Sequence, residues 1–314
     1  MSSKNDPRPL FEKLAQARAR LVAAGISDTD AALDVDLYAR TILGWDRATL
    51  LTEQREAAPV TLEPRFSEWL DRRERREPTA YIVGIREFWG LDFTVTPAVL
   101  IPRPETEFIV EESLGILSGG LPFDYRSGHP EHRRGVKASG YRDGGLRIAD
   151  IGTGSGCVAV SLAHEAPQCR IVATDLSPEA LAVARQNAAR HGVAGRVDFV
   201  HTSYLEGVEG EFDLIVANPP YVKDRDKPAL SRDVRHEPDV ALFGGADGLR
   251  DIGGVLDAAI DSLKPGGWFV MEFGYGQEDD VRALVGARPA LRVDHVREDL
   301  QGIPRTVVIQ RRAP

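Results

Sequence analysis

A glycine-rich loop decides the fold: it has the sequence Asp150-Ile151-Gly152-Thr153-Gly154-Ser155-Gly156 and lies between an apolar segment and an apolar helical pattern. Glycines at such a turn let the backbone approach a ligand closely, and the first turn of the following helix offers unpaired N–H groups. A dinucleotide fingerprint requires glycine at its sixth position, where this chain has Cys157. The spacing favours a ligand with nucleoside and amino-acid parts but no pyrophosphate. Asp150 is interpreted either as an ordinary strand-end cap or as an indirect support for that ligand.

Strands and helices alternate from residue 146 onward, which is typical of a parallel sheet covered by helices. Helices are predicted over 158–166, after a Ser177 cap, and over 248–263, and a turn at 264–267 is predicted to precede a strand. The predicted strands cover residues 146–149, 170–174, 197–200, 212–217, 268–273, 291–296 and 306–310. The last two are expected to form an antiparallel hairpin at the edge of the sheet. The fold class is therefore α/β, with a seven-stranded, Rossmann-like sheet.

The beginning of the chain has helical periodicity instead. One helix is predicted over residues 10–22. A second is predicted to start at a cap formed by Asp28 or Thr29 and to stop at Gly44, and a third follows Pro64. No nucleophile or metal cluster stands out here, so this part is predicted to recognise a partner and not to carry chemistry.

The chain is predicted to have two domains, an all-α domain at residues 1–85 and an α/β domain at 86–314. The charged run at 71–76 is interpreted as a solvated helix face because both signs alternate within it. Residues 118–145 are rich in Gly, Arg, His and Pro and lack apolar periodicity, which predicts a flexible insertion in the second domain.

Two polar positions follow predicted strands, where open α/β sheets bind ligands. Asp175 ends the second strand, so its carboxylate is expected to accept both hydroxyls of a ribose; the alternative is a turn residue before Ser177. The tetrapeptide Asn218-Pro219-Pro220-Tyr221 follows the apolar strand at 212–217. Its alternative interpretation is a proline-rich turn.

The tetrapeptide suits a planar NH2 group. The Asn218 side-chain oxygen and the Pro219 carbonyl are able to accept both N–H bonds and bias the nitrogen lone pair towards an incoming methyl group. Pro219 and Pro220 stiffen the chain, and Tyr221 offers a flat face for stacking. Asn218 and Pro219 are therefore the candidate catalytic residues, and all four are candidate substrate-binding residues.

The composition narrows the class of protein. The 314 residues carry a net charge of −9, which disfavours a stable nucleic-acid partner because phosphate binding usually needs a basic face. No run approaches the roughly 20 apolar residues of a membrane span, and the start lacks the apolar core of a secretory signal. Two cysteines, with His129 and His132, match no metal spacing. We expect a cytoplasmic monomer without membrane or metal.

The glycine loop together with the Asn218 tetrapeptide resembles the amino-methylating branch of the class I methyltransferases. Further stretches resemble the release factor glutamine methyltransferase (HemK/PrmC) family: Arg76-Glu77-Pro78-Thr79-Ala80-Tyr81-Ile82-Val83-Gly84, Glu87-Phe88-Trp89-Gly90-Leu91, Leu100-Ile101-Pro102-Arg103-Pro104-Glu105-Thr106-Glu107, Glu237-Pro238, Gly244-Gly245-Ala246-Asp247-Gly248-Leu249, and Asp299-Leu300-Gln301-Gly302 with Arg305.

The resemblance implies S-adenosylmethionine as cofactor and, as substrate, the glutamine in the Gly-Gly-Gln loop of peptide chain release factors, methylated on its side-chain nitrogen (N5). It implies that the helical domain binds the release factor. It also implies the cofactor-binding residues, which are Gly152, Thr153, Gly154, Ser155, Gly156, Asp175, Tyr204 and Asn218. The alternatives are an N6-adenine methyltransferase acting on DNA or RNA, which shares the tetrapeptide, and a non-enzymatic cofactor-binding adaptor.

Overall fold

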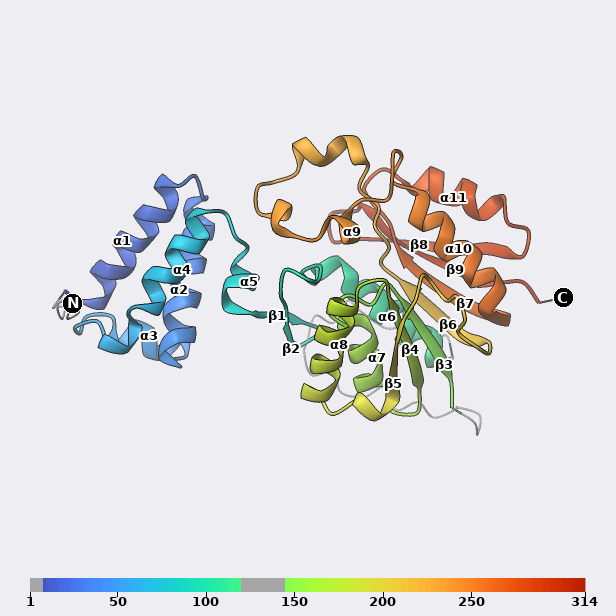
Figure 1. Cartoon of the computed structure of the whole chain (residues 1–314), viewed down its shortest axis with the longest axis horizontal. Helices are drawn as coiled ribbons and strands as arrows, with labels where there is room; N and C mark the ends of the chain where they lie inside the picture. The colour runs from blue at the N-terminus through green and yellow to red at the C-terminus, as the bar shows by residue number, and fades with distance from the viewer. Residues whose placement is uncertain (1–7, 120–144, 314) are drawn as a thin grey trace. The chain divides into compact units, whose positions relative to one another are not determined.

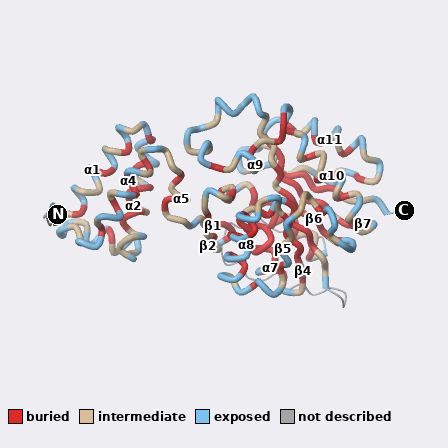
Figure 2. Tube along the Cα trace, in the orientation of Figure 1, coloured by how far each residue is buried: buried red, intermediate tan, exposed pale blue. Residues whose placement is uncertain are grey.

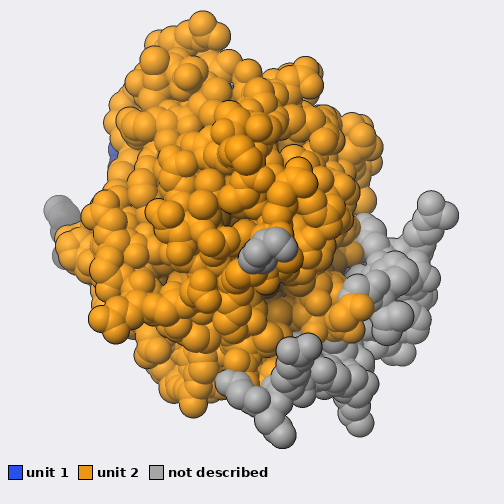
Figure 3. Space-filling model, turned by 90° about the vertical axis from the view of Figure 1, so that its right-hand side faces the viewer, with its two compact units in different colours: residues 1–84, 231–236 blue, residues 85–230, 237–314 orange. Residues whose placement is uncertain are grey.

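The computed structural model describes residues 8–119 and 145–313 (Figure 1). The chain divides into two compact units, residues 1–84 with 231–236 and residues 85–230 with 237–314 (Figure 3). Residues 120–144 of the predicted insertion lie outside the described residues. Within the described part, none of the helices has the length and apolar character needed to traverse a bilayer.

The first unit is helical, as its periodicity predicts. Its buried side chains include Leu10, Leu21, Tyr38 and Phe66, which come from three helices and form one core. Its elements are α1 (Leu10–Ala23), α2 (Asp28–Leu43), α3 (Arg47–Glu53), η1 (Val60–Leu62), α4 (Arg65–Glu74), α5 (Thr79–Val83) and η7 (Val234–His236).

The predicted cap of α2 is wrong by one residue. Ser27 caps the helix, because its hydroxyl accepts a hydrogen bond from the Asp30 N–H at 3.0 Å, and Asp28 and Thr29 are already helical. A serine is as good a cap as an aspartate, so residue type alone does not separate Ser27 from Asp28. Gly44 ends the helix in the left-handed conformation, as predicted.

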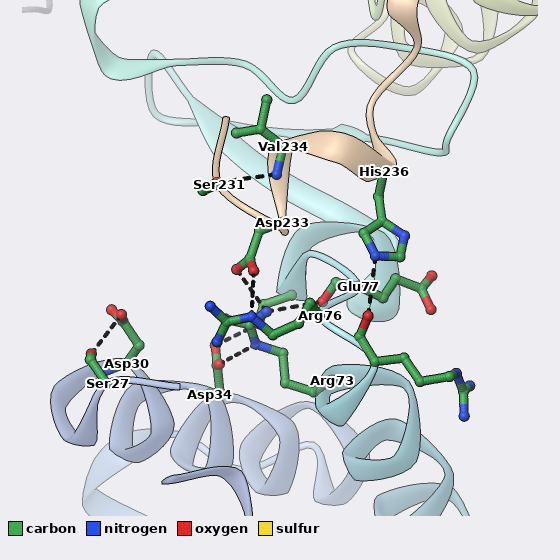
Figure 4. Close-up of polar contacts among 12 residues, drawn as sticks. Ser27, Asp30, Asp34, Arg73, Arg76, Glu77, Ser231, Asp233, Val234 and His236 are labelled. Carbon is green, nitrogen blue, oxygen red and sulfur yellow. Dashed lines mark hydrogen bonds and ion pairs between the residues drawn. The ribbon is translucent and has the colours of Figure 1, made fainter. Parts of the chain in front are cut away.

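The interpretation of residues 71–76 as a solvated face is wrong at Arg73, which is 6% exposed. Its guanidinium donates to Asp34 at 2.7 Å and to Asp233 at 2.8 Å (Figure 4). Arg76 lies 3.2 Å from the other carboxylate oxygen of Asp233. A buried arginine needs such partners because an unpaired charge is costly in the interior. Segment 231–236 therefore belongs to the helical unit, although the chain enters it from the other unit.

The second unit contains the predicted seven-stranded sheet, in the order β5-β4-β3-β6-β7-β9-β8. The first five strands in this order are parallel, and β9 runs antiparallel to both β7 and β8, which confirms the edge hairpin. The strands are β3 (Arg147–Ile151), β4 (Arg170–Asp175), β5 (Val197–His201), β6 (Phe212–Ala217), β7 (Leu263–Glu272), β8 (Leu291–Glu298) and β9 (Pro304–Arg311). A separate hairpin pairs β1 (Ile85–Phe88) with β2 (Leu91–Thr94).

Helices cover both faces of the sheet, and the parallel strands between them are largely buried (Figure 2). These strands carry apolar residues on both sides. In β6, Leu214 and Val216 pack with α6, α7 and α8, whereas Ile215 and Ala217 pack with α10 and α11. The remaining elements are η2 (Pro104–Thr106), α6 (Glu107–Leu117), α7 (Cys157–Glu165), α8 (Pro178–Arg190), η5 (Ala194–Arg196), η6 (Asp224–Ala229), α9 (Asp239–Leu242), α10 (Arg250–Ser262) and α11 (Glu278–Gly286).

The turn predicted at 264–267 lies within the bounds of β7, which starts at Leu263. Gly266 has φ of +78°, and pairing with β6 resumes at Trp268, where the predicted strand begins. The pairing of β6 with β7 shifts register between Phe212 and Leu214, and this irregularity accommodates the two glycines without ending the strand.

Candidate active site

A cavity of about 350 Å³ opens at the carboxyl ends of the parallel strands in the second unit. This volume falls in the range of about 300–1,000 Å³ that is usual for small-molecule sites. Nearly all of the predicted site residues line it. The lining comprises residues 98–100, 102–103, 106, 150–155, 157–158, 174–177, 180, 202, 204, 218–220, 238, 240–241, 250–251 and 255.

The glycine loop forms one wall of the cavity. Gly152 and Gly154 have φ of +71° and +54°, and a Cβ added at either would meet no atom within 4 Å. The two glycines therefore satisfy a backbone requirement and leave open space on the cavity side. Gly156 does not line the cavity: a Cβ there would lie 3.1 Å from the Ala184 Cβ, so this glycine allows α7 to pack closely against α8.

Asp150 holds the glycine loop through hydrogen bonds to its buried side chain. Its carboxylate is 3% exposed, and one of its oxygens accepts hydrogen bonds from the Thr153 hydroxyl at 2.7 Å and the Ala159 N–H at 3.2 Å. Burial raises the pKa of Asp150 to about 6 because the charged form loses its hydration. The interpretation of Asp150 as a strand-end cap is wrong, because β3 continues through it to Ile151. Its side chain instead holds Thr153 of the loop, and the residue lines the cavity.

Asp175 ends β4 on the same side of the cavity. Its two oxygens accept from the Gly154 and Ser177 N–H groups, both at 2.9 Å, so the side-chain orientation is fixed. Burial raises the pKa of this carboxyl above its usual range, and the backbone donors oppose that effect. Each carboxylate oxygen has a further lone pair for a hydroxyl donor. As predicted, Asp175 is the last residue of its strand, and it lines the cavity.

Tyr204 closes another part of the wall in a strained conformation, with φ of +47°. Its hydroxyl donates to Asp251 at 3.0 Å, and its backbone carbonyl accepts from the Thr174 hydroxyl at 2.6 Å. Gly254 of α10 allows the ring to lie close, because a Cβ there would be 2.3 Å from the Tyr204 Cζ. These contacts hold a flat ring at the cavity surface, which suits a planar base.

The tetrapeptide is divided between the cavity and the protein interior. Asn218, Pro219 and Pro220 line the cavity, whereas Tyr221 does not. The Tyr221 hydroxyl donates to the Glu272 carboxylate at 3.0 Å, and this negative charge, with burial, raises the pKa of the phenol far above its usual range. The prediction that Tyr221 offers a stacking face to the ligand is therefore wrong. Its side chain instead anchors the tetrapeptide to Glu272 outside the cavity.

Close backbone contacts also hold the tetrapeptide. The Gln277 side chain donates to the Tyr221 carbonyl at 3.1 Å. A Cβ at Gly244 would lie 2.4 Å from the Pro220 carbonyl oxygen, and one at Gly248 would lie 2.3 Å from the Tyr221 carbonyl oxygen. No larger side chain fits at either glycine. The backbone of the tetrapeptide is therefore closely packed on the side away from the cavity.

The Asn218 side chain is held through its nitrogen. Its Nδ2 donates to the Thr106 hydroxyl at 3.1 Å, and the Thr106 hydroxyl donates to Glu272 at 2.6 Å. Glu272 is 2% exposed, and burial raises the pKa of its carboxyl. Thr106 and Glu272 were given no role from the sequence.

A second buried glutamate joins two walls of the cavity. Glu237 is 4% exposed and accepts from the Ile101 N–H at 3.1 Å and from the Arg103 guanidinium. Ile101 and Arg103 belong to the proline-containing stretch at 100–107, and Pro238, which follows Glu237, also lines the cavity. Both stretches carried the family resemblance, and this was the one sequence signal for their importance.

The donor set fits a ligand with a nucleoside and an amino-acid part. One cavity is lined by the Asp175 carboxylate, which is able to accept from hydroxyl groups, by the flat ring of Tyr204 and by the open glycine loop. The Asn218 amide in the same lining provides an acceptor for an N–H group. The chemistry that this arrangement supports is polarisation of a nitrogen nucleophile beside a bound nucleoside.

Two family models match the chain, the PrmC N-terminal domain at residues 12–84 and the methyltransferase small domain at 142–238. The release factor glutamine methyltransferase of Bradyrhizobium diazoefficiens is 39% identical over 94% of this chain and 93% of its own length. That of Moorella thermoacetica is 38% identical over 96% and 99%. Among solved structures, the hMettl16 catalytic domain in complex with MAT2A 3′UTR hairpin 6 matches with a TM-score of 0.53 at 14% identity, over 76% of this chain and 81% of that one, which shows the fold alone.

Proposed function

Because this chain belongs to the release factor glutamine methyltransferase family, we propose that it methylates the side-chain nitrogen (N5) of a glutamine in a peptide chain release factor. The glutamine is the one in the Gly-Gly-Gln loop. The observation that carries this proposal is that Asn218 and Pro219 line the same cavity as Asp175 and the glycine loop. A nitrogen-polarising group and a nucleoside-binding wall therefore share one space.

The cavity takes S-adenosylmethionine, which when bound supplies a methyl group on a positively charged sulfur. We assign the glycine loop at 152–155 to its amino-acid part, Asp175 to the ribose hydroxyls and Tyr204 to the adenine. Asp175 is oriented for this by the Gly154 and Ser177 N–H groups. Gly156 contributes through helix packing and not through contact with the cofactor.

Asn218 and Pro219 prepare the substrate nitrogen. An amide nitrogen is a poor nucleophile because its lone pair is delocalised into the carbonyl. The Asn218 Oδ1 and the Pro219 carbonyl accept its two hydrogens, which holds the NH2 group in one orientation and favours charge on nitrogen. Positioning and polarisation come first in this mechanism, so no titrating base is required before the nitrogen reacts; the extra proton leaves afterwards.

The helical unit is proposed to bind the release factor, since the PrmC N-terminal domain model matches it. Its buried Arg73 pairs with Asp34 and Asp233, which is a structural role. The net charge of −9 supports a protein substrate over a nucleic acid, which makes the N6-adenine alternative the weaker one. We also propose that the enzyme acts in the cytoplasm as a monomer.

The test uses Asn218→Ala with labelled S-adenosylmethionine, offered either a purified release factor or nucleic acid. The wild-type protein should label the release factor, and the variant should lose turnover by about 100-fold or more, in the range of removing one preorganised polar group from an active site. Calorimetry should show cofactor affinity within about threefold of wild type. Near-normal turnover in the variant would refute the role of Asn218, and label on nucleic acid alone would favour the adenine methyltransferase.

A further inference from the structure

The orientation of the Asn218 amide decides whether the site works as proposed. The oxygen and nitrogen of an asparagine side chain are similar in size but opposite in hydrogen bonding: one accepts and the other donates. If the amide turned over, Nδ2 would face the N–H groups of the substrate, and two donors would meet. The fold therefore needs a device that keeps Oδ1 on the substrate side.

Three side chains from distant parts of the sequence, Thr106, Tyr221 and Glu272, form hydrogen bonds that fix which atom of the Asn218 amide acts as donor. Glu272 ends β7 and accepts hydrogen bonds from the Thr106 hydroxyl (2.6 Å) and the Tyr221 hydroxyl (3.0 Å). Thr106 is 3% exposed and in turn accepts from the Asn218 Nδ2 at 3.1 Å. Among the described residues, the Asn218 side chain forms its hydrogen bond through nitrogen alone.

The direction follows from counting hydrogens. Both side-chain oxygens of Glu272 accept, one from the Thr106 hydroxyl and the other from the Tyr221 hydroxyl. The Thr106 hydroxyl has one hydrogen and donates it to Glu272, which leaves only lone pairs for its second neighbour. That neighbour must then be a donor, and Asn218 must present Nδ2 and not Oδ1. The carboxylate thus sets the direction of both hydrogen bonds in the chain.

We propose that Thr106 and Glu272 are positioning residues, which hold the Asn218 amide with its oxygen towards the substrate nitrogen. This inference rests on the proposed function of Asn218. Thr106 lines the cavity and Glu272 does not. Neither is assigned a contact with substrate or cofactor, and both act through Asn218. Tyr221 contributes to the same array by giving the second carboxylate oxygen of Glu272 a donor.

The first test compares Thr106→Val with Thr106→Ser. Valine keeps the volume and removes the hydroxyl, so the amide is free to turn over; we expect kcat to fall about 10- to 100-fold, less than or similar to the loss of one oxyanion donor. Serine restores the hydroxyl and should restore kcat to within about threefold. The KM for the release factor and the calorimetric affinity for S-adenosylmethionine should change by less than about threefold in both variants.

Thr306→Val is the matched control. Thr306 pairs with Glu272 across β7 and β9, is fully buried, and its hydroxyl has no hydrogen-bond partner in the described part of the chain. The same chemical change there should leave kcat, KM and cofactor affinity unchanged. If this control lost as much kcat as Thr106→Val, the effect would be one of packing and the inference would be wrong.

Glu272→Gln is the second variant and decides the question if Thr106→Val does not fold. Glutamine keeps the shape but is able to donate to Thr106, which frees the threonine hydrogen for the Asn218 Oδ1, so kcat should fall about 10-fold while cofactor binding persists. Wild-type kcat in both Glu272→Gln and Thr106→Val, with Asn218→Ala inactive, would overturn the positioning role and leave the proposed function standing. An active Asn218→Ala would instead refute the proposed function.

Discussion

Asp150→Asn should stabilise the protein in a pH-dependent way. Asp150 is 3% exposed, and burial raises its pKa from 3.8 to about 6. At about 1.4 kcal/mol per tenfold change in proton affinity, this difference corresponds to about 3 kcal/mol. The folded state binds the proton more tightly than the unfolded state, so the stabilisation is present at low pH and is lost as the pH rises through about 6. Asparagine keeps an acceptor for Thr153 and Ala159 but never ionises.

The assay is urea unfolding of both proteins without cofactor, at about pH 7.5 and about pH 5, followed by circular dichroism. Between these values the wild type regains about 1.4 kcal/mol by protonating Asp150, so the stability advantage of the variant should shrink by about that amount on acidification. The change in this gap does not depend on how well asparagine packs. Asp198→Asn on β5, where the side chain is exposed, is the control and should show no such change. A gap that stays constant with pH for Asp150→Asn would refute the reasoning.

Two further substitutions test other parts of the structure. Arg73→Met should lower the unfolding free energy of the helical unit by about 3 kcal/mol in urea denaturation, because it leaves the Asp34 and Asp233 carboxylates without their shared cation; unchanged stability would contradict the assigned ion pairs. Gly254→Ala should weaken S-adenosylmethionine binding about 10-fold or more in calorimetry. The added Cβ would lie 2.3 Å from the Tyr204 Cζ, so the ring would have to move. Normal affinity would show that this ring does not shape the site.

Local sequence pattern was enough to predict the elements of the sheet. Strand β6 has the bounds predicted for residues 212–217, because a strand buried on both faces is a continuous apolar run that ends where polar residues begin. The Ser177 cap was also correct, since it accepts from the Ala180 N–H at 3.0 Å. The sequence predicted that the glycine loop, Asp175 and Asn218 follow strand ends, and the carboxyl ends of parallel strands meet at one edge of a sheet. In the structure these residues line one cavity.

Local sequence pattern did not predict the polar contacts between residues that are far apart in the sequence. Arg73 pairs with Asp233, 160 residues away, so a charged run that looked solvated contains a buried residue. Thr106 meets Glu272 over 166 residues, and neither periodicity nor spacing relates them. Tyr221 was misjudged for the same reason, because its partner Glu272 ends a strand that lies elsewhere in the sequence. Hydrogen-bond partners of this kind depend on the three-dimensional arrangement and not on neighbouring residues.

Buried carboxylates receive either a guanidinium, as Glu237 does from Arg103, or only uncharged donors. In the helical unit Asp34 receives the Arg73 guanidinium, which suits a scaffold. At the active-site edge of the sheet, the hydrogen bonds to Asp150, Asp175 and Glu272 within the described residues come from hydroxyl and backbone N–H donors, which carry no charge.

Burial raises the pKa of all three of these active-site carboxyls, which means that ionising them costs folding free energy. A nearby guanidinium would remove that cost, but it would also neutralise the field that these groups create. Neutral donors orient each carboxylate, and Asp150 and Asp175 lie in the cavity wall, where their negative charge acts on a ligand. The stability lost at this edge therefore maintains an electrostatic environment suited to a positively charged sulfur and to a nitrogen that gains positive charge as it reacts.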